Sequence, residues 1–432
     1  MAPSEAARNR APQLAERLAR QPDAVQTQVE AMPDEIENRT GALTTVDAAE
    51  DALVARVRQL GQAGLTAWVQ QHCAQLNATP PPGARTGPQK KLRWLSTFGA
   101  VAVLEPSWRR GPVHLRPFAT QARVRCRGCS RRLQRALTDF GADEAFAPAA
   151  AKVREHYGVA VTPERVRQVC LTHAGRLVET APPACTTLRA HGPAHLVAEA
   201  DGTMLPIVDT SSAPAGADKR QHRRVRWQEA RVVAAQAHGA TTTHYDATLG
   251  DVAEAGARWS RAAGAAGRGV NTRIHAVGDG APGSPTKPAV RFGAAGTYLL
   301  DLYHVCAYLA AVWPGDKARL HRHRDALKAG RTDAVLTALR DRLEPPDTPE
   351  AAAPARRALR YLENRRAQLD YPAALAAGLP VGSGLSESAH RHLLQARLKL
   401  AGAWWTQPHA HAMAQLRVCR ANLRWDAYWQ KN

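Results

Sequence analysis

The chain has 432 residues, and its 58 Lys and Arg against 38 Asp and Glu give a net charge of +20. This length is enough for two or three units with their own cores. No apolar run reaches the ~20 residues of a membrane span, the N-terminus lacks a secretory leader, and seven scattered Cys do not suggest a disulfide framework. We therefore expect a cytoplasmic, nucleoid-associated protein with no membrane contact, whose partner is a polyanion, nucleic acid first.

The N-terminal third changes character along its length. Residues 1–46 are polar and Ala-rich without sustained periodicity, so we expect a mostly disordered arm. Residues 47–91 combine a predicted helix over Asp47–Asn77 with a Pro/Gly-rich linker. Positive charge lies further downstream, where residues 105–180 carry 14 Lys and Arg against 7 Asp and Glu.

Residues 92–190 are predicted to form an N-terminal, mainly helical DNA-binding region. After β-like runs, two helices over residues 146–177 resemble a helix-turn-helix pair. The second helix would present Arg165 and Arg167 to DNA. An ordinary helical hairpin with a solvated basic face is the alternative.

An α/β region follows, with five strand-like runs and a helix, Asp251–Gly264, between the third and the fourth. The runs read HLVAEADGTMLPIV, EARVVAAQAH, TTTHYDATLG, TRIHAVGDG and GTYLLDLYH. Three strands, a helix, then alternating strand and helix is the order of an RNase H-like sheet. We predict this α/β core over residues 191–302, a helical insertion over 303–377, and C-terminal helices of the core over 378–432.

Two acids share one setting. Asp201 and Asp279 each follow an apolar run and have glycine beside them. A carboxylate at a strand end with a neighbouring glycine lets a metal ion and a phosphate approach the backbone closely. Because Asp-Gly is also a common turn signal, either acid alone can be a plain turn.

A third acid, Glu387, lies in the segment GLPVGSGLSESAHRHLLQARLKL, where a glycine turn precedes a basic helix. Helical spacing aligns Glu387 with Leu394 and Leu398, so we expect it to face protein. A solvated pair with Arg391 is the alternative. Three carboxylates from separate elements suit phosphoryl transfer with two Mg²⁺ or Mn²⁺ ions, which prefer oxygen ligands.

Four motifs in this order resemble the ISKra-type bacterial insertion-sequence transposases, relatives of the Mutator-like DDE group. They are ADGTMLPIV, GDGA, YLLDLYHVCAYL and the stretch from LPVGSGLSESAHRH to NLRWDAYW. The resemblance implies an RNase H-like catalytic domain whose acid triad is Asp201, Asp279 and Glu387, with an all-helical insertion before the Glu. His304 matches a recurring family position. Asp301 competes as second acid, but Asp279 ends a strand between glycines.

Such a protein would bind the terminal inverted repeats of its element, cleave there, and join the freed 3′-hydroxyls to target DNA. Because two ends must be paired, a homodimer or a larger assembly is expected on DNA. Two alternatives remain open: a transposase-derived DNA-binding or regulatory protein without cleavage, and an RNase H-like nuclease without strand transfer.

Further side chains are candidates for DNA contact. The basic run from Lys219 to Arg231 surrounds Trp227, and the C-terminal helix adds more cations. Paired tryptophans nearby can stack on bases or lie in the core. The candidates are Arg224, Arg226, Arg391, Arg397, Lys399, Trp404 and Trp405.

Cysteine spacing suggests a zinc site. Cys126-x-x-Cys129 and Cys170-x-x-His173 would supply a Cys₃His ligand set. Burial of Cys170 as plain core in a helix is the alternative.

Overall fold

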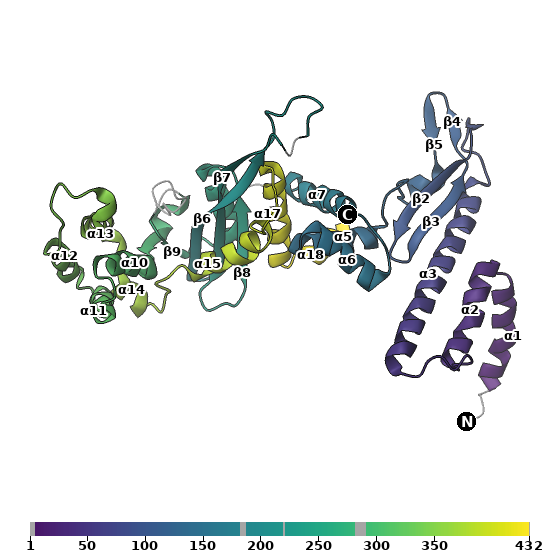
Figure 1. Cartoon of the computed structure of the whole chain (residues 1–432), viewed down its shortest axis with the longest axis horizontal. Coiled ribbons are helices and arrows are strands. Elements are labelled where there is room, and N and C mark those ends of the chain that lie inside the picture. Colours follow the sequence, from purple (N-terminus) through teal and green to yellow (C-terminus); the bar gives the residue numbers. More distant parts are fainter. Residues whose placement is uncertain (1–4, 182–186, 219–220, 281–290, 432) are drawn as a thin grey trace. The chain divides into compact units, whose positions relative to one another are not determined.

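The computed structural model describes residues 5–181, 187–218, 221–280 and 291–431 (Figure 1). The chain folds into two compact units, Met1–Cys170 and Leu171–Asn432. No described helix is both long enough and apolar enough to cross a membrane.

The first unit begins with three helices, α1 (Glu5–Ala19), α2 (Asp23–Ile36) and α3 (Val46–Asn77). Arg56 of α3 donates to Gln28 and Glu35 of α2 at 3.1 and 2.6 Å. The arm expected to be disordered over residues 1–46 therefore contains two helices where the structure describes it. Helix α2 was not predicted, and it buries no residue fully; Val25, Val29 and Met32 are half-buried.

Strands follow α3, as the β-like runs within residues 92–190 predict, although the first strand begins earlier, at Arg85. β1 (Arg85–Thr86), β4 (Trp108–Arg110) and β5 (Val113–Leu115) form a small antiparallel sheet, and β2 (Lys90–Ser96) pairs with β3 (Gly99–Glu105). A short helix, α4 (Pro117–Gln121), comes next. One side of the β2–β3 hairpin, including Leu92 and Val101, packs on Val69 and Cys73 of α3.

Three helices close the first unit: α5 (Arg131–Asp143), α6 (Phe146–Tyr157) and α7 (Pro163–Glu179), the last of which continues into the second unit. Their shared core contains Leu133, Leu137, Val153 and Val166. The helical pair predicted over residues 146–177 is confirmed, whereas α5 was not predicted.

The second unit is built on a five-stranded mixed sheet in the order β10-β9-β6-β7-β8. β7 runs antiparallel to β6 and β8, whereas β9 is parallel to both β6 and β10. The strands are β6 (His195–Asp209), β7 (Arg224–Ala237), β8 (Thr243–Thr248), β9 (Arg273–Gly278) and β10 (Gly296–Leu300). All five predicted strands are confirmed, as is the helix between the third and fourth, α8 (Val252–Ala265).

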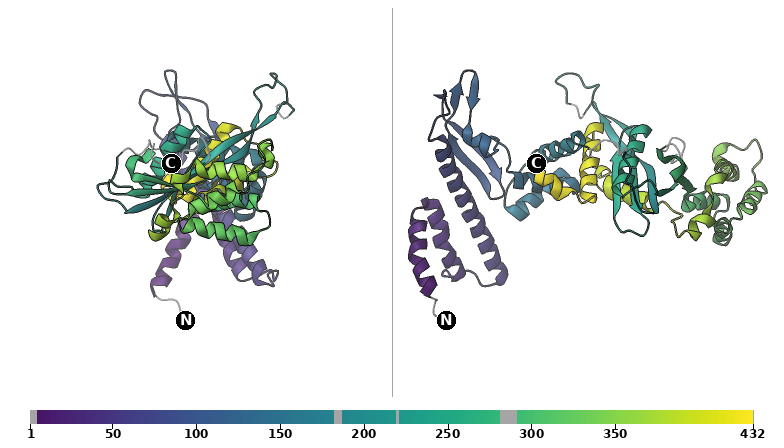
Figure 2. Two further views of the ribbon diagram at one scale, coloured as in Figure 1. Left: turned by 90° about the vertical axis from the view of Figure 1, so that its left-hand side faces the viewer. Right: turned by 180° about the vertical axis from the view of Figure 1, so that it is seen from behind.

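β6 and β7 are longer than their neighbours. β9 pairs with β6 only over His195–Glu199, whereas β7 stays paired with β6 as far as Asp209. The distal halves of β6 and β7 therefore run past the other strands as a two-stranded arm (Figure 2). Asp201 lies at the base of this arm, inside a strand and not at its end.

The two faces of the sheet have different coverings. Side-chain alternation places Leu196, Ala198 and Ala200 on the face that packs against α8. Glu199 and Asp201 point to the opposite face, which is covered by residues 380–398. There the His275 ring bonds to the Pro380 carbonyl at 2.8 Å.

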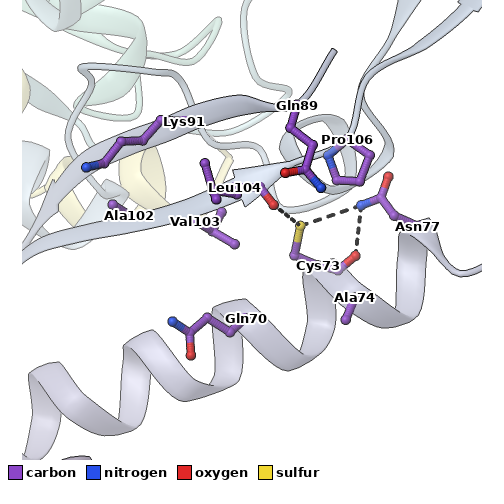
Figure 3. Close-up of a pocket in the computed structure, with 10 residues that line it drawn as sticks. All are labelled: Gln70, Cys73, Ala74, Asn77, Gln89, Lys91, Ala102, Val103, Leu104 and Pro106. Atoms are coloured by element: carbon purple, nitrogen blue, oxygen red, sulfur yellow. Dashed lines mark hydrogen bonds between the residues drawn. The ribbon is translucent and has the colours of Figure 1, made fainter. Parts of the chain in front are cut away.

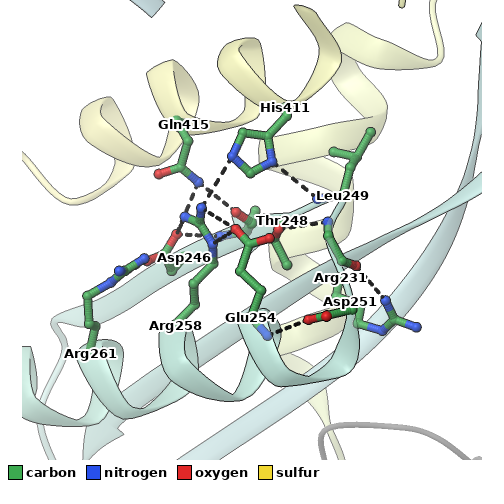
Figure 4. Close-up of polar contacts among 12 residues, drawn as sticks. Arg231, Asp246, Thr248, Leu249, Asp251, Glu254, Arg258, Arg261, His411 and Gln415 are labelled. Atoms are coloured by element: carbon green, nitrogen blue, oxygen red, sulfur yellow. Dashed lines mark hydrogen bonds and ion pairs between the residues drawn. The ribbon is translucent and has the colours of Figure 1, made fainter. Parts of the chain in front are cut away.

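A buried polar cluster joins β8 and α8 to helix α17 (Gln407–Ala421) (Figure 4). Asp246 accepts hydrogen bonds from Arg258 at 2.8 Å, Arg261 at 2.9 Å and Gln415 at 3.1 Å. Burial raises the pKa of Asp246, but the two guanidinium groups and the hydrogen bonds outweigh it and hold this pKa below its ordinary value. The cluster fixes α17 to the sheet edge.

The chain beyond β10 is helical, as predicted for residues 303–377. Five helices surround an apolar core of their own: α10 (Leu302–Val312), α11 (Lys317–Lys328), α12 (Thr332–Arg340), α13 (Pro354–Glu363) and α14 (Tyr371–Ala376). The C-terminal part contains α15 (Gly384–Ala389), a π-helix over His390–Gln395, α16 (Ala396–Leu398), α17 and α18 (Trp425–Lys431).

Candidate active site

The sheet brings Asp201 and Asp279 to neighbouring positions. The parallel pairing of β6 with β9 ends with Glu199 opposite Val277. Two residues further along each strand stand Asp201 and Asp279, so the register carries them side by side. Asp279 is the first residue after β9, whereas Asp201 lies in the middle of the longer strand β6. The two acids are neighbours because the register of the two strands continues to this point.

Charge interactions agree with this placement. Burial raises the pKa of Asp201, and the neighbouring Asp279 carboxylate raises it further. His390, the Gly202 N–H and His304 act in the opposite direction. Two carboxylates and two imidazoles thus act on one another at the end of β9.

The insertion holds the turn that carries Asp279. Tyr361 donates its hydroxyl proton to the Asp279 carbonyl at 2.7 Å, and Arg365 donates to the Gly280 carbonyl at 2.7 Å. The Gly280 N–H donates in turn to the Tyr298 hydroxyl at 2.9 Å. The helices between the second and third candidate acids therefore fix the second one.

Sequence reasoning missed His390. Its Nδ1 lies 3.6 Å from Asp201 Oδ2, and its Nε2 lies 3.2 Å from the Asp201 carbonyl oxygen. The side chain is buried. A signal was present, because His390 follows Glu387 by three residues and so lies one turn along the same helix.

Glu387 does not face protein as its alignment with Leu394 and Leu398 predicted. Its side chain is exposed, whereas the two leucines are buried. The π-helix over His390–Gln395 is the reason, since its wider turn takes the following residues out of α-helical phase with Glu387. Glu387 instead faces solvent, three residues before the buried His390.

The glycine turn before α15 is anchored by two buried carboxylates. Asp301 accepts from the Ser383 N–H at 2.7 Å and from the Ser383 hydroxyl, and it also caps α10. Glu199 accepts from the Ser386 N–H at 2.8 Å and its hydroxyl at 3.2 Å. Asp301 is thus occupied as a structural cap.

Glu199 is a second residue that the sequence analysis did not single out. Burial raises its pKa to about 7, and the Ser386 hydrogen bonds limit the rise. It lies two residues before Asp201 on the same face of the sheet, where it links β6 to the start of α15.

Two of the predicted DNA contacts are buried. Arg397 is 1 % and Trp405 is 4 % exposed, and the Arg397 guanidinium lies 4.7 Å from the centre of the Trp405 indole. The Trp405 carbonyl accepts from the Val208 N–H at 2.8 Å. Both residues back the β6–β7 arm, so the expectation that they contact DNA is corrected.

The other candidates are more accessible. Arg224, Arg226, Arg391, Lys399 and Trp404 are exposed, whereas Arg165 and Arg167 are half-buried. The Arg223 guanidinium stacks 3.7 Å from the Trp404 ring centre, and Lys399 donates to the Thr203 hydroxyl at 3.0 Å. Lys219 and Arg220 of the basic run, and Ala281 of GDGA, lie outside the described residues.

The proposed zinc ligands have other surroundings. Cys126 is exposed, and Cys170 is buried against the Thr138 carbonyl. The His173 ring bonds to the Tyr428 hydroxyl at 2.7 Å and packs on Trp429. Across the described residues, no group of three or more His, Cys, Asp or Glu side chains stands together as a metal site.

A groove of about 660 Å³ lies between α3 and the β2–β3 hairpin (Figure 3). Its one thiol, Cys73, lies 3.9 Å from the Leu104 carbonyl and has a pKa raised by burial and by Glu105. Such a thiol is protonated at neutral pH and is a poor nucleophile. The groove therefore lacks the reactive groups that surround Asp201.

Comparison of the chain with models of known protein families and with curated protein sequences finds no match.

Proposed function

We propose that this protein is a DNA transposase that binds insertion-sequence ends, cleaves them, and transfers the 3′-hydroxyl strands to target DNA. The observation that carries the proposal is the placement of Asp201 beside Asp279 at the end of β9, with His390 in contact with Asp201. Since two ends must be joined in one reaction, the acting species is a dimer or a larger assembly on DNA.

The order of elements supports an RNase H-like core for this activity. Three antiparallel strands, β6, β7 and β8, precede α8, and the parallel strands β9 and β10 follow it. A separate helical body then leads to the helix that carries the third acid. This is the chain order that the motif resemblance implies.

The donor set suits divalent cations. Asp201, Asp279 and Glu387 would hold two Mg²⁺ or Mn²⁺ ions, because they offer carboxylate oxygens only. Asp279 also raises the pKa of Asp201, a repulsion that a cation would relieve. Such ions, when bound, stabilise negative charge on the attacking and leaving oxygens of a phosphodiester.

The surrounding residues orient this pair of acids. His390 contacts Asp201 through both ring nitrogens, and Tyr361 holds the Asp279 backbone. Glu199 and Asp301 fix the turn from which Glu387 projects. The function of these side chains is positioning, which is where most of the catalytic effect in phosphoryl transfer arises.

The test is a cleavage assay with the purified full chain, Mg²⁺, and end-labelled duplexes covering the DNA on either side of its coding sequence. We expect Asp201→Asn and Asp279→Asn to abolish cleavage and leave duplex binding unchanged. Asp209→Asn is the matched control, because this exposed acid lies on the same strand away from the site. If either variant cleaves as well as the wild type, the replaced aspartate has no role in catalysis.

The products separate the two alternatives from the proposal. Binding without cleavage identifies a DNA-binding or regulatory protein. The exposed position of Glu387 agrees with that outcome, because such a protein needs no third metal ligand. Cleavage without joining to a second duplex identifies an RNase H-like nuclease. Cleavage followed by joining is the outcome that the proposal requires.

A further inference from the structure

The β-rich part of the first unit carries an unbalanced charge. Residues 85–132, which include β1–β5, contain twelve Lys and Arg but a single acid, Glu105. Eleven of the twelve cations are exposed, and Arg116 is half-buried. Glu105 is 1 % exposed and accepts from the Ala119 N–H at 2.9 Å. The only carboxylate of this segment therefore lies away from its surface cations.

These cations have no protein partners within the described chain. None of the twelve side chains forms a hydrogen bond or an ion pair with another described residue. Cations elsewhere in the same unit differ: Arg39, Arg56, Lys152 and Arg167 each pair with an acid. Several cations of this unit outside residues 85–132 are therefore neutralised by acids, whereas the twelve within residues 85–132 are not.

Cross-strand pairing adds to the imbalance. In the small sheet, Arg109 of β4 lies directly opposite Arg85 of β1 on one side and opposite His114 of β5 on the other. The other face is anchored, since the buried Trp108 donates its indole N–H to Asn77 at 3.1 Å. Like charges directly opposite each other destabilise a sheet. A bound polyanion would neutralise these cations and so relieve the repulsion between them.

Two arginines also adopt a backbone conformation that side chains other than glycine rarely take. Arg123 and Arg127 have φ values of 53° and 60°. The Arg127 N–H donates to the Arg93 carbonyl, which ties this turn to the edge of β2. Such conformations persist where the surroundings hold them, and they gather at binding sites.

We propose that the exposed cations of residues 85–132, here called the basic strand surface, bind the phosphate backbone of duplex DNA. The choice of DNA among polyanions rests on the proposed function. The surface differs from the α6–α7 pair expected to dock on DNA, because the Arg167 guanidinium is held by Glu164 through two contacts of 2.7 Å. Phosphate contacts of this kind position a protein without reading sequence.

The test compares two triple variants of the full chain in duplex-binding titrations at several salt concentrations. Arg85→Gln, Arg93→Gln and Arg109→Gln together remove three charges of the basic strand surface. Each lost phosphate contact lowers the slope of log affinity against log salt by about 0.9. Between about 50 and 200 mM salt, the wild type should therefore weaken about 40-fold more than this variant.

Arg340→Gln, Arg360→Gln and Arg366→Gln form the matched control. They remove the same charge from the helical insertion, where each arginine pairs with an acid. This variant should keep the wild-type slope. The strand variant should also melt at the wild-type temperature or above it, since it relieves like-charge repulsion, and this checks that lost binding is not unfolding.

A strand variant with the wild-type affinity and salt slope would overturn the proposal. So would a wild type that fails to bind duplex DNA, or one that binds duplex RNA more tightly. Failure of the proposed function looks different: the wild type binds DNA with the expected slope, and neither it nor Asp201→Asn cleaves. Loss of cleavage by Asp201→Asn with unchanged salt-dependent binding supports the proposed function, and a lower salt slope for the strand variant supports the basic strand surface.

Discussion

His390 touches Asp201 at two points, with Nδ1 3.6 Å from the carboxylate Oδ2 and Nε2 3.2 Å from the backbone carbonyl oxygen. One imidazole thus contacts both the side chain and the main chain of the first candidate acid. It ties helix α15 to the point where β9 leaves the sheet.

Replacing His390 by Gln should lower the cleavage rate roughly 10- to 100-fold, the usual effect of losing a group that orients a reactive carboxylate. Duplex affinity should not change, because the ring is buried. The measurement is single-turnover cleavage beside a binding titration. His392→Gln is the control, since this exposed histidine lies two residues away on the same helix. Equal rates for the two variants would exclude a positioning role for His390.

Ser386→Ala should destabilise the second unit by about 1–3 kcal/mol, because Glu199 is buried and loses the Ser386 hydroxyl as a donor. Cleavage should fall as well, since α15 loses part of its anchor. Ser388→Ala, at an exposed position of the same helix, should be close to wild type. Urea unfolding of both variants checks this, and an unchanged midpoint for Ser386→Ala would contradict it.

Gly382→Ala should impair cleavage more than Gly384→Ala. A Cβ at residue 382 would lie 2.6 Å from the Tyr303 ring, whereas one at residue 384 meets nothing within 4 Å. Because Tyr303 is exposed, the ring can move, so the loss should be partial. Adding Tyr303→Ala to Gly382→Ala should restore the rate. Failure of this double variant to recover would place the defect in the backbone of the turn.

Asp246→Asn should cost about 1–3 kcal/mol at neutral pH, because Arg258 and Arg261 lose their shared buried carboxylate, while Glu254 still pairs with Arg258. The folded-state pKa of Asp246 is lowered, so its stabilisation is present above the unfolded pKa of about 4 and is lost as pH falls below it. The difference in unfolding free energy between wild type and Asp246→Asn should therefore become smaller as the pH is lowered.

His411 and Glu254 also face Arg258 in this cluster. The pKa of each is lowered in the folded state, so each also makes the protein less stable as pH falls. Burial lowers the pKa of His411, and the hydrogen bonds from Arg258 outweigh burial to lower that of Glu254. Both remain in the variant, so residual acid sensitivity is expected. Thermal unfolding from pH 7 to about 3 measures the gap. Asp333→Asn, which removes an exposed ion pair, should change stability by at most about 1 kcal/mol.

Sequence alone determined the order of elements in the second unit. Strand-like runs marked the five strands, the stretch Asp251–Gly264 marked α8, and a helical pattern marked the insertion. These signals are local, because each depends on residues within a few positions of one another. The same local signals picked out Asp201 and Asp279 beside their glycines.

Only the tertiary structure decided which side chains meet. The register of β6 with β9 places Asp201 next to Asp279, and the π-helix turns Glu387 outward while His390 reaches Asp201. It also buries Arg397 and Trp405 behind the arm and packs α2 against α3 through polar contacts such as Arg56 with Glu35. Each of these outcomes depends on contacts between residues far apart in the chain, and such contacts leave no periodic trace in the sequence.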